Sequence, residues 1–586
     1  MTYITRENFI LPKETQDYYG LDTETTGLEV YTSKVRLLQI ANPKERLVYD
    51  LFKLDDEHKK QLKDFLESHK FYIHNALFDV PLLMQTFHIK YITCMDTLIM
   101  YSLVLKATYT GTKSTIKFPK SLRIVMKVLF DVEISKEEQT SDWSRADLSS
   151  EQIQYAELDP LYAYMIGNKL KTHEALQTLN FKLTCASINA LARMKLTGIK
   201  IDVPRLDALI DEWQEKVDES YKECLIHFKD ININSSVQLG NWLEKNVDKK
   251  ILDSWERTDK TNRLNTDAEA LKNHVREVPK LLSLVEYKKY YKYLSTYGDN
   301  IKAFINPVSG RIHGDYKLAF TDTGRLSSMK PNIQNFPREE WYRSIFIPEK
   351  NNVLICADYS QVEVRVAAIL SGEERMLKAY REGKDLYKHT ASLLLHKPEA
   401  EITKAERQQA KAVVLGLQFG MGASTLCKYA LNYNVVLTEA ESKKLVDGYR
   451  QAYPMLYEWQ LNTTALAKET LMCETVCGMK RKLDDDNYYT CSLNTPVQGS
   501  SAEVILYALW KLDKEICDNN IPARIVATVH DEVLVECDKR VGEKVRDMLS
   551  RVMLEAFRFV FNRIGIKGAD ANIVEAHIGG NWYEAK

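Results

Sequence analysis

The 586-residue sequence has no run of about 18 apolar residues that could span a membrane. Its first residues, MTYITRENFILPKETQ, have neither the apolar core of a signal peptide nor an Arg- and Ser-rich amphipathic pattern. The ten cysteines are scattered, and the closest two, Cys473 and Cys477, have no neighbouring His or Cys to complete a zinc site. These absences predict a cytoplasmic protein with reduced thiols, and they disfavour secreted and membrane-spanning classes.

The sequence also lacks an excess of either charge, because 80 basic residues stand against 81 acidic ones and the formal net charge is -1. No global positive field therefore indicates a nucleic-acid partner, and any DNA contact must come from local stripes of cations. The segment EYKKYYKYLSTY (286–297) interleaves lysines with aromatic rings and is a candidate for such a stripe. For each single lysine, a solvated helix face is the alternative interpretation.

Neither a repeat nor a low-complexity linker divides the chain. At roughly 100–200 residues per domain, its length predicts three or four domains. Up to about residue 171, β-rich runs such as 18–22 and 71–73 alternate with helical patterns such as 57–68. The pattern is then helical and highly charged up to about residue 302.

The last part of the chain mixes both patterns. β-rich runs at 353–357 and 525–536 flank a helical stretch at about 373–449. One sheet interrupted by a helical insertion is the simplest architecture for this order of elements.

Two acidic motifs beside β-rich runs predict a paired-carboxylate site. In VLICADYSQVEVR the run ends at Asp358, and in RIVATVHDEVLVE two runs flank His530, Asp531 and Glu532 as in a tight hairpin. Two strand ends can bring the aspartates together, and such a pair needs the compensating charge that two Mg²⁺ ions supply. The arrangement suits nucleotidyl transfer, in which metal ions activate a hydroxyl and neutralise a pyrophosphate leaving group. Either aspartate alone is more often a turn or strand-end residue.

A third element, RQQAKAVVLGLQFG, places Arg407, Lys411, Leu415 and Phe419 four residues apart. At about 3.6 residues per turn they form one slowly drifting stripe on a helix. Its two cations suit a triphosphate, and its apolar half offers a wall for a base. By itself such a stripe is most often an ordinary amphipathic face.

The N-terminal region carries a second set of acids. Asp22 and Glu24 are two residues apart on an expected strand, so both carboxylates project from one face. Asp79 follows another β-rich run, and Tyr155 and Asp159 are expected on one helix face at i and i+4. Four acids and a tyrosine could hold two metal ions and orient a water molecule for phosphodiester hydrolysis. A lone Asp-x-Glu pair is usually only a solvated or capping pair.

The ordered motifs resemble those of a known family. ADYSQVEVR (357–365), RQQAKAVVLGLQFGMG (407–422) and VHDEVLVE (529–536) resemble motifs A, B and C of the family A DNA polymerases. TGRLSSMKPNIQNFP, NTPVQGSSAE and GGNWYEAK match further family segments in the same order. The N-terminal acids resemble the Exo I, II and III motifs of DEDDy proofreading exonucleases.

The resemblance covers nearly the whole chain and implies an α/β and α+β multidomain fold, with an RNase H-like 3′→5′ exonuclease domain followed by a right-hand polymerase. The expected division is 1–175 for the exonuclease domain, 176–302 for a connector and helical thumb, 303–372 for the first part of the palm, 373–485 for the fingers and 486–586 for the second part of the palm.

The resemblance also implies roles for single residues. Asp358 and Asp531, beside Glu532, are expected to bind the polymerase metals, and Asp22, Glu24, Asp79 and Asp159 those of the exonuclease, with Tyr155 beside them. The expected nucleotide contacts are Arg407, Lys411, Leu415, Phe419, Gln361, Tyr387 and Glu363, which resembles the family's steric gate against ribonucleotides. The expected primer and template contacts are Arg325, Gln334, Asn335, Arg343, Asn494, Gln498, His530 and the thumb lysines Lys288, Lys289 and Lys292.

Three positions depart from the family pattern. The family usually has Phe or Tyr where Leu415 stands, Tyr where Phe419 stands and His where Tyr387 stands. Leu415 has no hydroxyl to replace a missing substrate 3′-hydroxyl, so we expect strong discrimination against dideoxynucleotides. These departures, on a chain without an N-terminal 5′-nuclease segment, are typical of phage or viral polymerases.

The expected enzyme is a monomeric DNA-dependent DNA polymerase that takes primer-template DNA and dNTPs and uses two Mg²⁺ ions per active site, with Mn²⁺ as an alternative. Helicase, primase or processivity partners are not indicated by the sequence. A single-subunit RNA polymerase is an alternative, against which Glu363 and the exonuclease acids argue. A DNA-binding scaffold with decayed sites is the second alternative, and the intact acids disfavour it.

Overall fold

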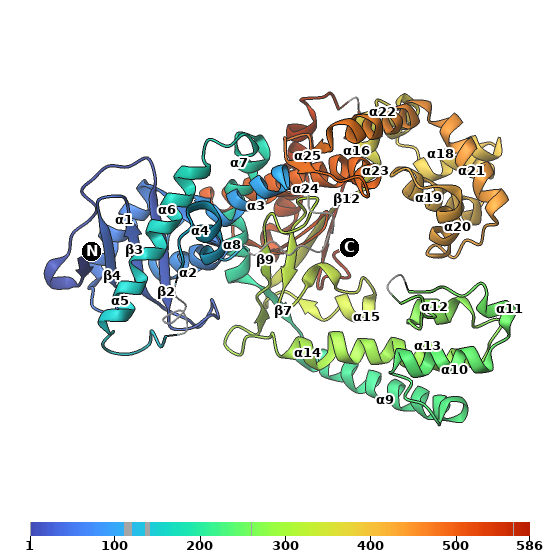
Figure 1. Cartoon of the computed structure of the whole chain (residues 1–586), viewed down its shortest axis with the longest axis horizontal. Helices are drawn as coiled ribbons and strands as arrows, with labels where there is room; N and C mark the ends of the chain where they lie inside the picture. The colour runs from blue at the N-terminus through green and yellow to red at the C-terminus, as the bar shows by residue number, and fades with distance from the viewer. Residues whose placement is uncertain (1, 110–119, 135–140, 259–260, 567) are drawn as a thin grey trace.

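The computed structural model describes residues 2–109, 120–134, 141–258, 261–566 and 568–586. Figure 1 shows an N-terminal α/β unit at the left and two arms at the right, with β12 and the C-terminus between the arms. The lower arm contains the long helices α9 and α13, and the upper arm contains the helical block α18–α21. The predicted fold class is therefore confirmed in outline.

The N-terminal unit is built on a six-stranded sheet with the order β1-β4-β3-β2-β5-β6. Its strands are β1 (Thr2–Ile4), β2 (Tyr19–Thr25), β3 (Val35–Ala41), β4 (Arg46–Asp50), β5 (Lys70–Ile73) and β6 (Thr93–Asp96). In β2 the buried Leu21, Thr23 and Thr25 alternate with the half-buried Asp22 and Glu24, so the two acids share one face as predicted.

Helices α2, α3 and α6 pack against this sheet. The helices of the unit are η1 (Arg6–Asn8), α1 (Asp56–Ser68), α2 (Ala76–Phe87), α3 (Thr97–Thr108), α4 (Leu122–Phe130), α5 (Ser150–Ala156), α6 (Leu158–Leu170) and η2 (Glu174–Leu176). Tyr155 and Asp159 do not share one continuous helix, because α5 ends at Ala156 and α6 starts at Leu158. Their side chains still meet through a hydrogen bond across this one-residue break, as the i and i+4 spacing predicts.

A helical region leads from this unit into the lower arm. Its elements are α7 (Leu179–Ala186), α8 (Ile188–Thr197), β7 (Ile199–Ile201), α9 (Val203–Phe228), α10 (Ser236–Asn246), α11 (Lys249–Leu252), α12 (Ala268–Asn273), α13 (Leu281–Lys292), η3 (Tyr293–Gly298) and α14 (Asp299–Lys302). The arm has its own apolar core, which includes Phe228, Leu243, Trp255 and Leu284. It can therefore keep its shape while projecting from the body.

The C-terminal half contains a four-stranded antiparallel sheet with the order β15-β16-β12-β17. Its strands are β12 (Asn352–Tyr359), β15 (Ala523–Val529), β16 (Glu532–Asp538) and β17 (Val574–Gly579). Both predicted β-regions thus lie in one sheet, as expected. Three shorter strand sets surround it: β11 (Phe346–Ile347) and β8 (Arg311–Ile312) flank β7, β9 (Asp315–Lys317) pairs with β10 (Ser327–Met329), and β13 (Met472–Glu474) pairs with β14 (Lys480–Lys482).

The helical insertion between β12 and β15 forms the upper arm and part of the body. Its helices are α16 (Val362–Ser371), α17 (Glu374–Arg381), α18 (Leu386–Leu395), η5 (Glu399–Glu401), α19 (Lys404–Leu417), α20 (Ala423–Leu431), α21 (Glu439–Ala452), α22 (Pro454–Thr470), α23 (Tyr488–Asn494), η6 (Thr495–Gly499) and α24 (Ser500–Asp518). Outside it lie η4 (Ile333–Asn335), α15 (Glu340–Arg343), η7 (Lys539–Val541) and α25 (Gly542–Phe561).

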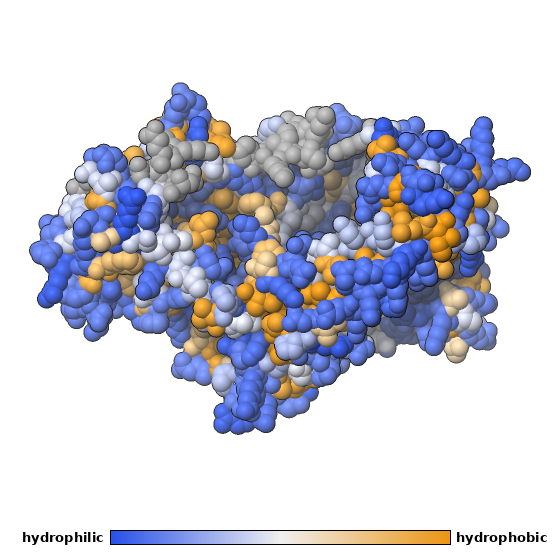
Figure 2. Space-filling model, turned by 90° about the horizontal axis from the view of Figure 1, so that it is seen from below, coloured by the Kyte–Doolittle hydropathy of each residue, from blue (hydrophilic) through white to orange (hydrophobic). Residues whose placement is uncertain are grey.

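All ten cysteines are free thiols, as predicted. Over the part of the chain that the structure describes, no helix is long and apolar enough to cross a bilayer. Figure 2 views the molecule from the side of α9 and shows a mostly hydrophilic face on which hydrophobic side chains gather in separate patches.

Candidate active sites

The N-terminal acids form a compact cluster. Ligand atoms of Asp22, Glu24 and Asp159 all lie within 4.8 Å of one another, and no other group of three or more His, Cys, Asp or Glu side chains in the described residues meets this test. Close packing of α6 on β2 makes the cluster possible, since a Cβ at Gly20 would lie 1.8 Å from the carbonyl oxygen of Pro160. Carboxylate oxygens are ligands that Mg²⁺ and Mn²⁺ prefer, so the cluster fits divalent cations.

Asp79 lies beside this cluster but is held separately. It is buried in the first turn of α2, and the hydroxyl of Thr23 donates a 2.6 Å hydrogen bond to its Oδ1. The N-terminus of α2 is fixed by Asp96, which accepts hydrogen bonds from the backbone N–H groups of Asn75 and Ala76. Thr23 and Asp96 were not predicted from the sequence, although Thr23 stands between the two acids of β2.

Burial and mutual repulsion dominate the electrostatics of the N-terminal acids. Burial raises the pKa of Asp22 and of Glu24, and the charges of Asp79 and Asp159 raise both further. Burial likewise raises the pKa of Asp79 and of Asp159 to about 7. Among the described residues no lysine or arginine forms an ion pair with these four acids, so a bound cation would relieve their repulsion.

Tyr155 reaches Asp159 across the break between α5 and α6. Burial raises the pKa of Tyr155 well above its usual range, and the charge of Asp159 adds to this effect. The phenol is therefore protonated at neutral pH and available as a hydrogen-bond donor at this cluster.

The C-terminal acids meet on the four-stranded sheet. Asp358 on β12 lies directly opposite Glu532 on β16. The backbone N–H of Tyr359 donates a 3.3 Å hydrogen bond to the carbonyl of Asp531, which holds the turn between β15 and β16 beside Asp358. The sequence-predicted pair Asp358 and Asp531 is thus brought together, although Asp358 stands one residue before the strand end.

Gln334 clamps the turn that carries Asp531. Its side-chain amide accepts a 2.7 Å hydrogen bond from the backbone N–H of His530 and donates a 2.9 Å hydrogen bond to the carbonyl of Thr528. His530 takes a left-handed conformation with φ of 55°, which the tight turn requires. Gln334, expected at the DNA, is buried in this structure and holds the turn through these two hydrogen bonds.

Burial of Asp358 and Asp531 close to one another disfavours the state in which both carboxylates are ionised. Burial raises the pKa of Asp531 to about 7, and the charge of Asp358 adds to this effect. Burial also raises the pKa of Asp358, although the ammonium of Lys586 opposes the shift. Within the described part of the chain, the buried Oδ1 of Asp358 has no hydrogen-bond partner. An orphaned carboxylate oxygen beside a second carboxylate fits a divalent cation.

Glu532 differs from its neighbours because it has cationic partners. Arg343 donates to its Oε1 at 3.0 Å, the indole N–H of Trp582 donates to the same oxygen, and Lys586 pairs with its Oε2. Burial alone would raise the pKa of Glu532, but the charges of Arg343 and Lys586 lower it below its ordinary value. Arg343, expected at the DNA, is buried in this structure and paired with Glu532.

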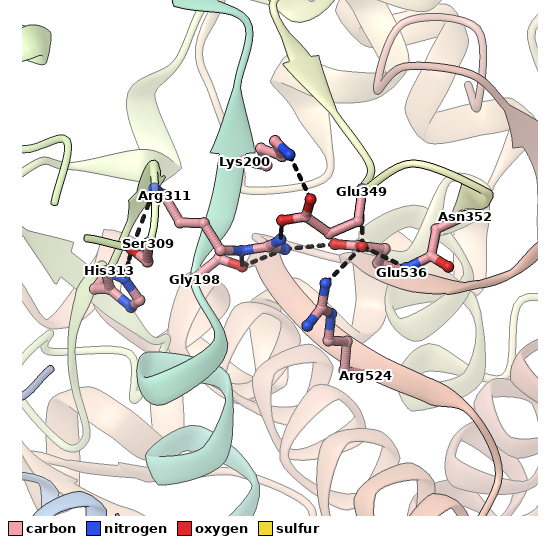
Figure 3. A network of polar contacts seen from close by, with 9 residues as sticks. All are labelled: Gly198, Lys200, Ser309, Arg311, His313, Glu349, Asn352, Arg524 and Glu536. Carbon is pink, nitrogen blue, oxygen red and sulfur yellow. Dashed lines mark hydrogen bonds and ion pairs between the residues drawn. The ribbon is translucent and has the colours of Figure 1, made fainter. Parts of the chain in front are cut away.

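A second charged network anchors the far end of β16 (Figure 3). Glu536 pairs with Arg311 and with Arg524, the latter at 2.7 Å, and accepts a 2.7 Å hydrogen bond from the Asn352 side chain. Arg311 also donates to the carbonyl of Gly198 at 3.1 Å. The network joins β7 and β8 to the sheet, so it fixes the strand that begins at Glu532.

The predicted nucleotide stripe lies on α19, which starts at a capping box of Thr403 and Glu406. Arg407 pairs with Asp385 at 2.7 Å, and its guanidinium lies 5.3 Å from the ring centre of Tyr387. The Nζ of Lys411 lies 6.0 Å from the same ring. Arg407, Lys411 and Tyr387 are thus brought together.

The expected continuation of the stripe to Phe419 was wrong. α19 ends at Leu417, and Gly420 takes a φ of 75° that a continuing helix cannot have. Leu415 remains on the helix and is half-buried, and Phe419 lies in the following turn.

Glu363, the expected steric gate, is paired with a cation in this structure. Glu363, in the first turn of α16, forms an ion pair with Arg325. Gln361 precedes this helix with a φ of 55°, and its side-chain oxygen accepts a 3.3 Å hydrogen bond from the hydroxyl of Tyr380.

The remaining expected DNA contacts lie on separate elements. Lys289 and Lys292 on α13 are exposed, whereas Lys288 is half-buried and burial lowers its pKa. Asn335 is exposed on η4, while Asn494 and Gln498 lie half-buried at the junction of α23 and η6.

Family models match both halves of the chain. The model described as DNA polymerase family A matches residues 203–584, and the model described as 3′-5′ exonuclease matches residues 2–173. Both clusters of acids therefore lie inside matched regions.

Curated relatives agree with these matches. DNA polymerase I of Aquifex aeolicus (strain VF5) is 29% identical over 594 residues, covering 97% of this chain and 96% of the relative. DNA polymerase I of Geobacillus stearothermophilus is 32% identical over 411 residues, covering 68% of this chain and 45% of the relative. The chain thus matches less than half the length of the second relative.

A solved structure shows the same fold. The structure described as the POL domain of Pol1 from M. smegmatis in complex with DNA primer-template and dNTP superimposes with a TM-score of 0.81 at 22% identity. The match covers 97% of this chain and 96% of that chain. The chain is therefore a DNA polymerase I-like enzyme with a 3′-5′ exonuclease domain, and it belongs to DNA polymerase family A.

Proposed function

We propose that the enzyme carries out template-directed DNA synthesis at Asp358 and Asp531 and removes mismatched 3′ ends at the cluster of Asp22, Glu24 and Asp159. The observation that carries the proposal is the presence of two separate carboxylate sites, each fitted to divalent cations, in one chain. Family A membership supports DNA synthesis as the reaction at the first site.

In synthesis, the residues of the chain bind and orient the substrates. Arg407 and Lys411 hold the triphosphate of the incoming dNTP, and Leu415 and Phe419 line its sugar and base. When primer binds, Arg325 leaves its ion pair with Glu363 and contacts the primer. Glu363 then occupies the space that a ribose 2′-hydroxyl would need. Asp358 and Asp531 would hold two divalent ions, which would lower the pKa of the primer 3′-hydroxyl and neutralise the leaving pyrophosphate.

In proofreading, Asp22, Glu24, Asp79 and Asp159 would hold the metal ions, and Tyr155 would orient the attacking water through its hydroxyl. Since all four acids have raised pKa values, protons compete with metal ions for this site. Mg²⁺ is the proposed ion at both sites, with two ions at each and Mn²⁺ as the alternative.

The proposed partners are primer-template DNA and dNTPs, which the M. smegmatis Pol1 structure is described as containing. Lys288, Lys289 and Lys292 face the duplex backbone, while Asn335, Asn494, Gln498 and His530 contact primer or template. The proposed domains are the exonuclease domain (1–175), the connector and thumb (176–302), the first part of the palm (303–372), the fingers (373–485) and the second part of the palm (486–586). The proposed enzyme is monomeric and cytoplasmic. A role in phage genome replication stays a prediction. The two curated relatives are bacterial and give it no support.

Primer extension on a DNA template, with dNTPs or rNTPs and with Mg²⁺ or EDTA, tests the proposal. We expect extension with dNTPs and Mg²⁺ only, together with removal of a mismatched 3′ end. Preferential extension with rNTPs would favour an RNA polymerase, and DNA binding without either reaction would favour a scaffold.

A further inference from the structure

The segment that follows β17 is firmly attached to the sheet region. Trp582 is fully buried, and its backbone N–H donates a 3.0 Å hydrogen bond to the carbonyl of Phe346. Ala585 is also fully buried, and it packs so closely on Gly579 that a Cβ at the glycine would lie 2.4 Å from its backbone nitrogen. Figure 1 shows this end of the chain beside β12, between the two arms. The backbone that carries Lys586 is therefore fixed.

The ammonium of Lys586 lies between two acids of the polymerase site. Its Nζ is 3.2 Å from Oδ2 of Asp358 and also pairs with Oε2 of Glu532. Because 31% of the side chain is exposed, its flexible stem has room to move while the backbone stays in place. Lys586 is thus a built-in cation at a carboxylate that fits a metal ion.

We infer that Lys586 is a positioning residue that sets the divalent-cation affinity of the polymerase site, by neutralising Asp358 until a metal ion takes its place. The inference rests on the proposed role of Asp358 as a metal ligand. An ammonium and a divalent cation at the same carboxylate repel each other, so metal binding requires Lys586 to withdraw toward Glu532 or solvent. The exonuclease cluster has no such lysine among the described residues, so its affinity for metal is not reduced in this way.

Removal of the lysine charge separates this role from simple structural support. In Lys586→Met the competing cation is lost, and we expect Mn²⁺ to bind the polymerase site about five- to tenfold more tightly in the absence of DNA. Lys586→Arg keeps the charge and should stay within about twofold of the parent. Lys539→Met is a matched control, because Lys539 is exposed just beyond the other end of β16.

Electron paramagnetic resonance of free Mn²⁺ measures this affinity in the full chain. All variants carry Asp22→Ala and Glu24→Ala, so that the exonuclease cluster does not contribute. Thermal melting in EDTA provides a second readout: Lys586→Met should melt at a lower temperature than the parent, and Mn²⁺ should remove the difference. If Lys586→Met does not fold, Lys586→Gln takes its place in both measurements.

Asp358→Ala distinguishes failure of the inference from failure of the proposed function. Loss of Mn²⁺ binding in Asp358→Ala, with tighter binding in Lys586→Met alone, supports the inference. Unchanged or weaker binding in Lys586→Met, while Asp358→Ala still abolishes binding, overturns the inference and leaves the proposed metal site intact. Undiminished binding in Asp358→Ala overturns the metal assignment, and the inference with it.

Discussion

The two acidic sites of this chain solve the same electrostatic problem in different ways. The exonuclease cluster gathers Asp22, Glu24 and Asp159 within 4.8 Å with no ion-paired lysine or arginine in the described residues. The polymerase site spreads its acids along two strands and pairs Glu532 with Arg343 and Lys586. The first site is therefore more strained without metal ions, whereas the second carries part of its compensating charge in the protein.

This difference has a functional consequence under the proposed mechanism. A polymerase site must admit and release a metal-bound nucleotide in every cycle, and a resident lysine can return when the ion leaves. An exonuclease site acts on the 3′ end of a DNA strand and takes up no metal-bound nucleotide. Its acids can therefore retain their metal ions from one cycle to the next.

The largest expected effect is at the aspartate pair. Asp358→Ala or Asp531→Ala should lower the rate of primer extension at least about a thousandfold, because each removes a proposed metal ligand. Degradation of the 3′ end should stay near the parent rate. Glu575→Ala is the control, since this exposed acid lies opposite Asp358 on β17. Near-normal extension by either aspartate variant would contradict the assignment.

Substitution of the exonuclease acids should abolish 3′-end removal rather than extension, with a loss of rate of similar size. Asp22→Ala combined with Glu24→Ala should lower removal of a mismatched primer end at least about a thousandfold and preserve extension. Gel analysis of a labelled mismatched primer measures the loss, and the exposed Asp17→Ala serves as control. Persistent removal by the purified double variant would place the nuclease elsewhere.

The sequence was sufficient to find both sets of acids but not to place their partners. Asp22 and Glu24 follow from the two-residue period of a strand, and that period holds in β2. The contact of Glu532 with Arg343 joins residues 189 positions apart, which no local pattern encodes.

Two further differences between the sequence-based predictions and the structure have local causes. The predicted helical stripe runs too far because α19 ends at Leu417, two residues before Phe419. The position of Lys586 cannot be predicted from the segment GGNWYEAK, because a single lysine there carries no periodic signal.

Glu363 tests selectivity within the polymerase site. Glu363→Ala should raise rNTP incorporation relative to dNTP about tenfold or more, because the space for a 2′-hydroxyl opens. Glu363→Gln keeps the volume but loses the ion pair with Arg325, and it should keep most of the discrimination. Single-nucleotide incorporation kinetics measure both, and equal effects of the two substitutions would assign discrimination to charge rather than to size.

The contrast between the sites also predicts a pH dependence. The folded pKa of Asp159, about 7, lies above the value near 4 of an unfolded aspartate, so the folded state binds more protons between these values. In EDTA this acid therefore lowers the free energy of unfolding as pH rises from about 4 to 7. Asp159→Asn should weaken that decline and Asp17→Asn should not, as measured by denaturant unfolding. An unchanged slope in Asp159→Asn would show that its pKa is not raised.

Leu415 gives the smallest expected effect. Leu415→Tyr should raise dideoxynucleotide incorporation several-fold relative to dNTP, because the phenol hydroxyl can replace the missing 3′-hydroxyl. Leu415→Phe is the matched control: it should remain restrictive while gaining about 0.5–1.5 kcal/mol of base stacking. Competition between dideoxynucleotides and dNTPs measures the ratio, and the same ratio in the parent and Leu415→Tyr would exclude a sugar contact.

A mixing experiment with a mismatched, 5′-labelled primer tests whether one chain holds two independent active sites. Asp358→Ala alone should shorten the primer without extending it, and the Asp22→Ala/Glu24→Ala variant alone should not remove the mismatch. A mixture of the two proteins should remove the mismatch and then extend the corrected primer, as the parent does. Loss of both activities in either variant, or failure of the mixture to extend the corrected primer, would contradict two independent active sites.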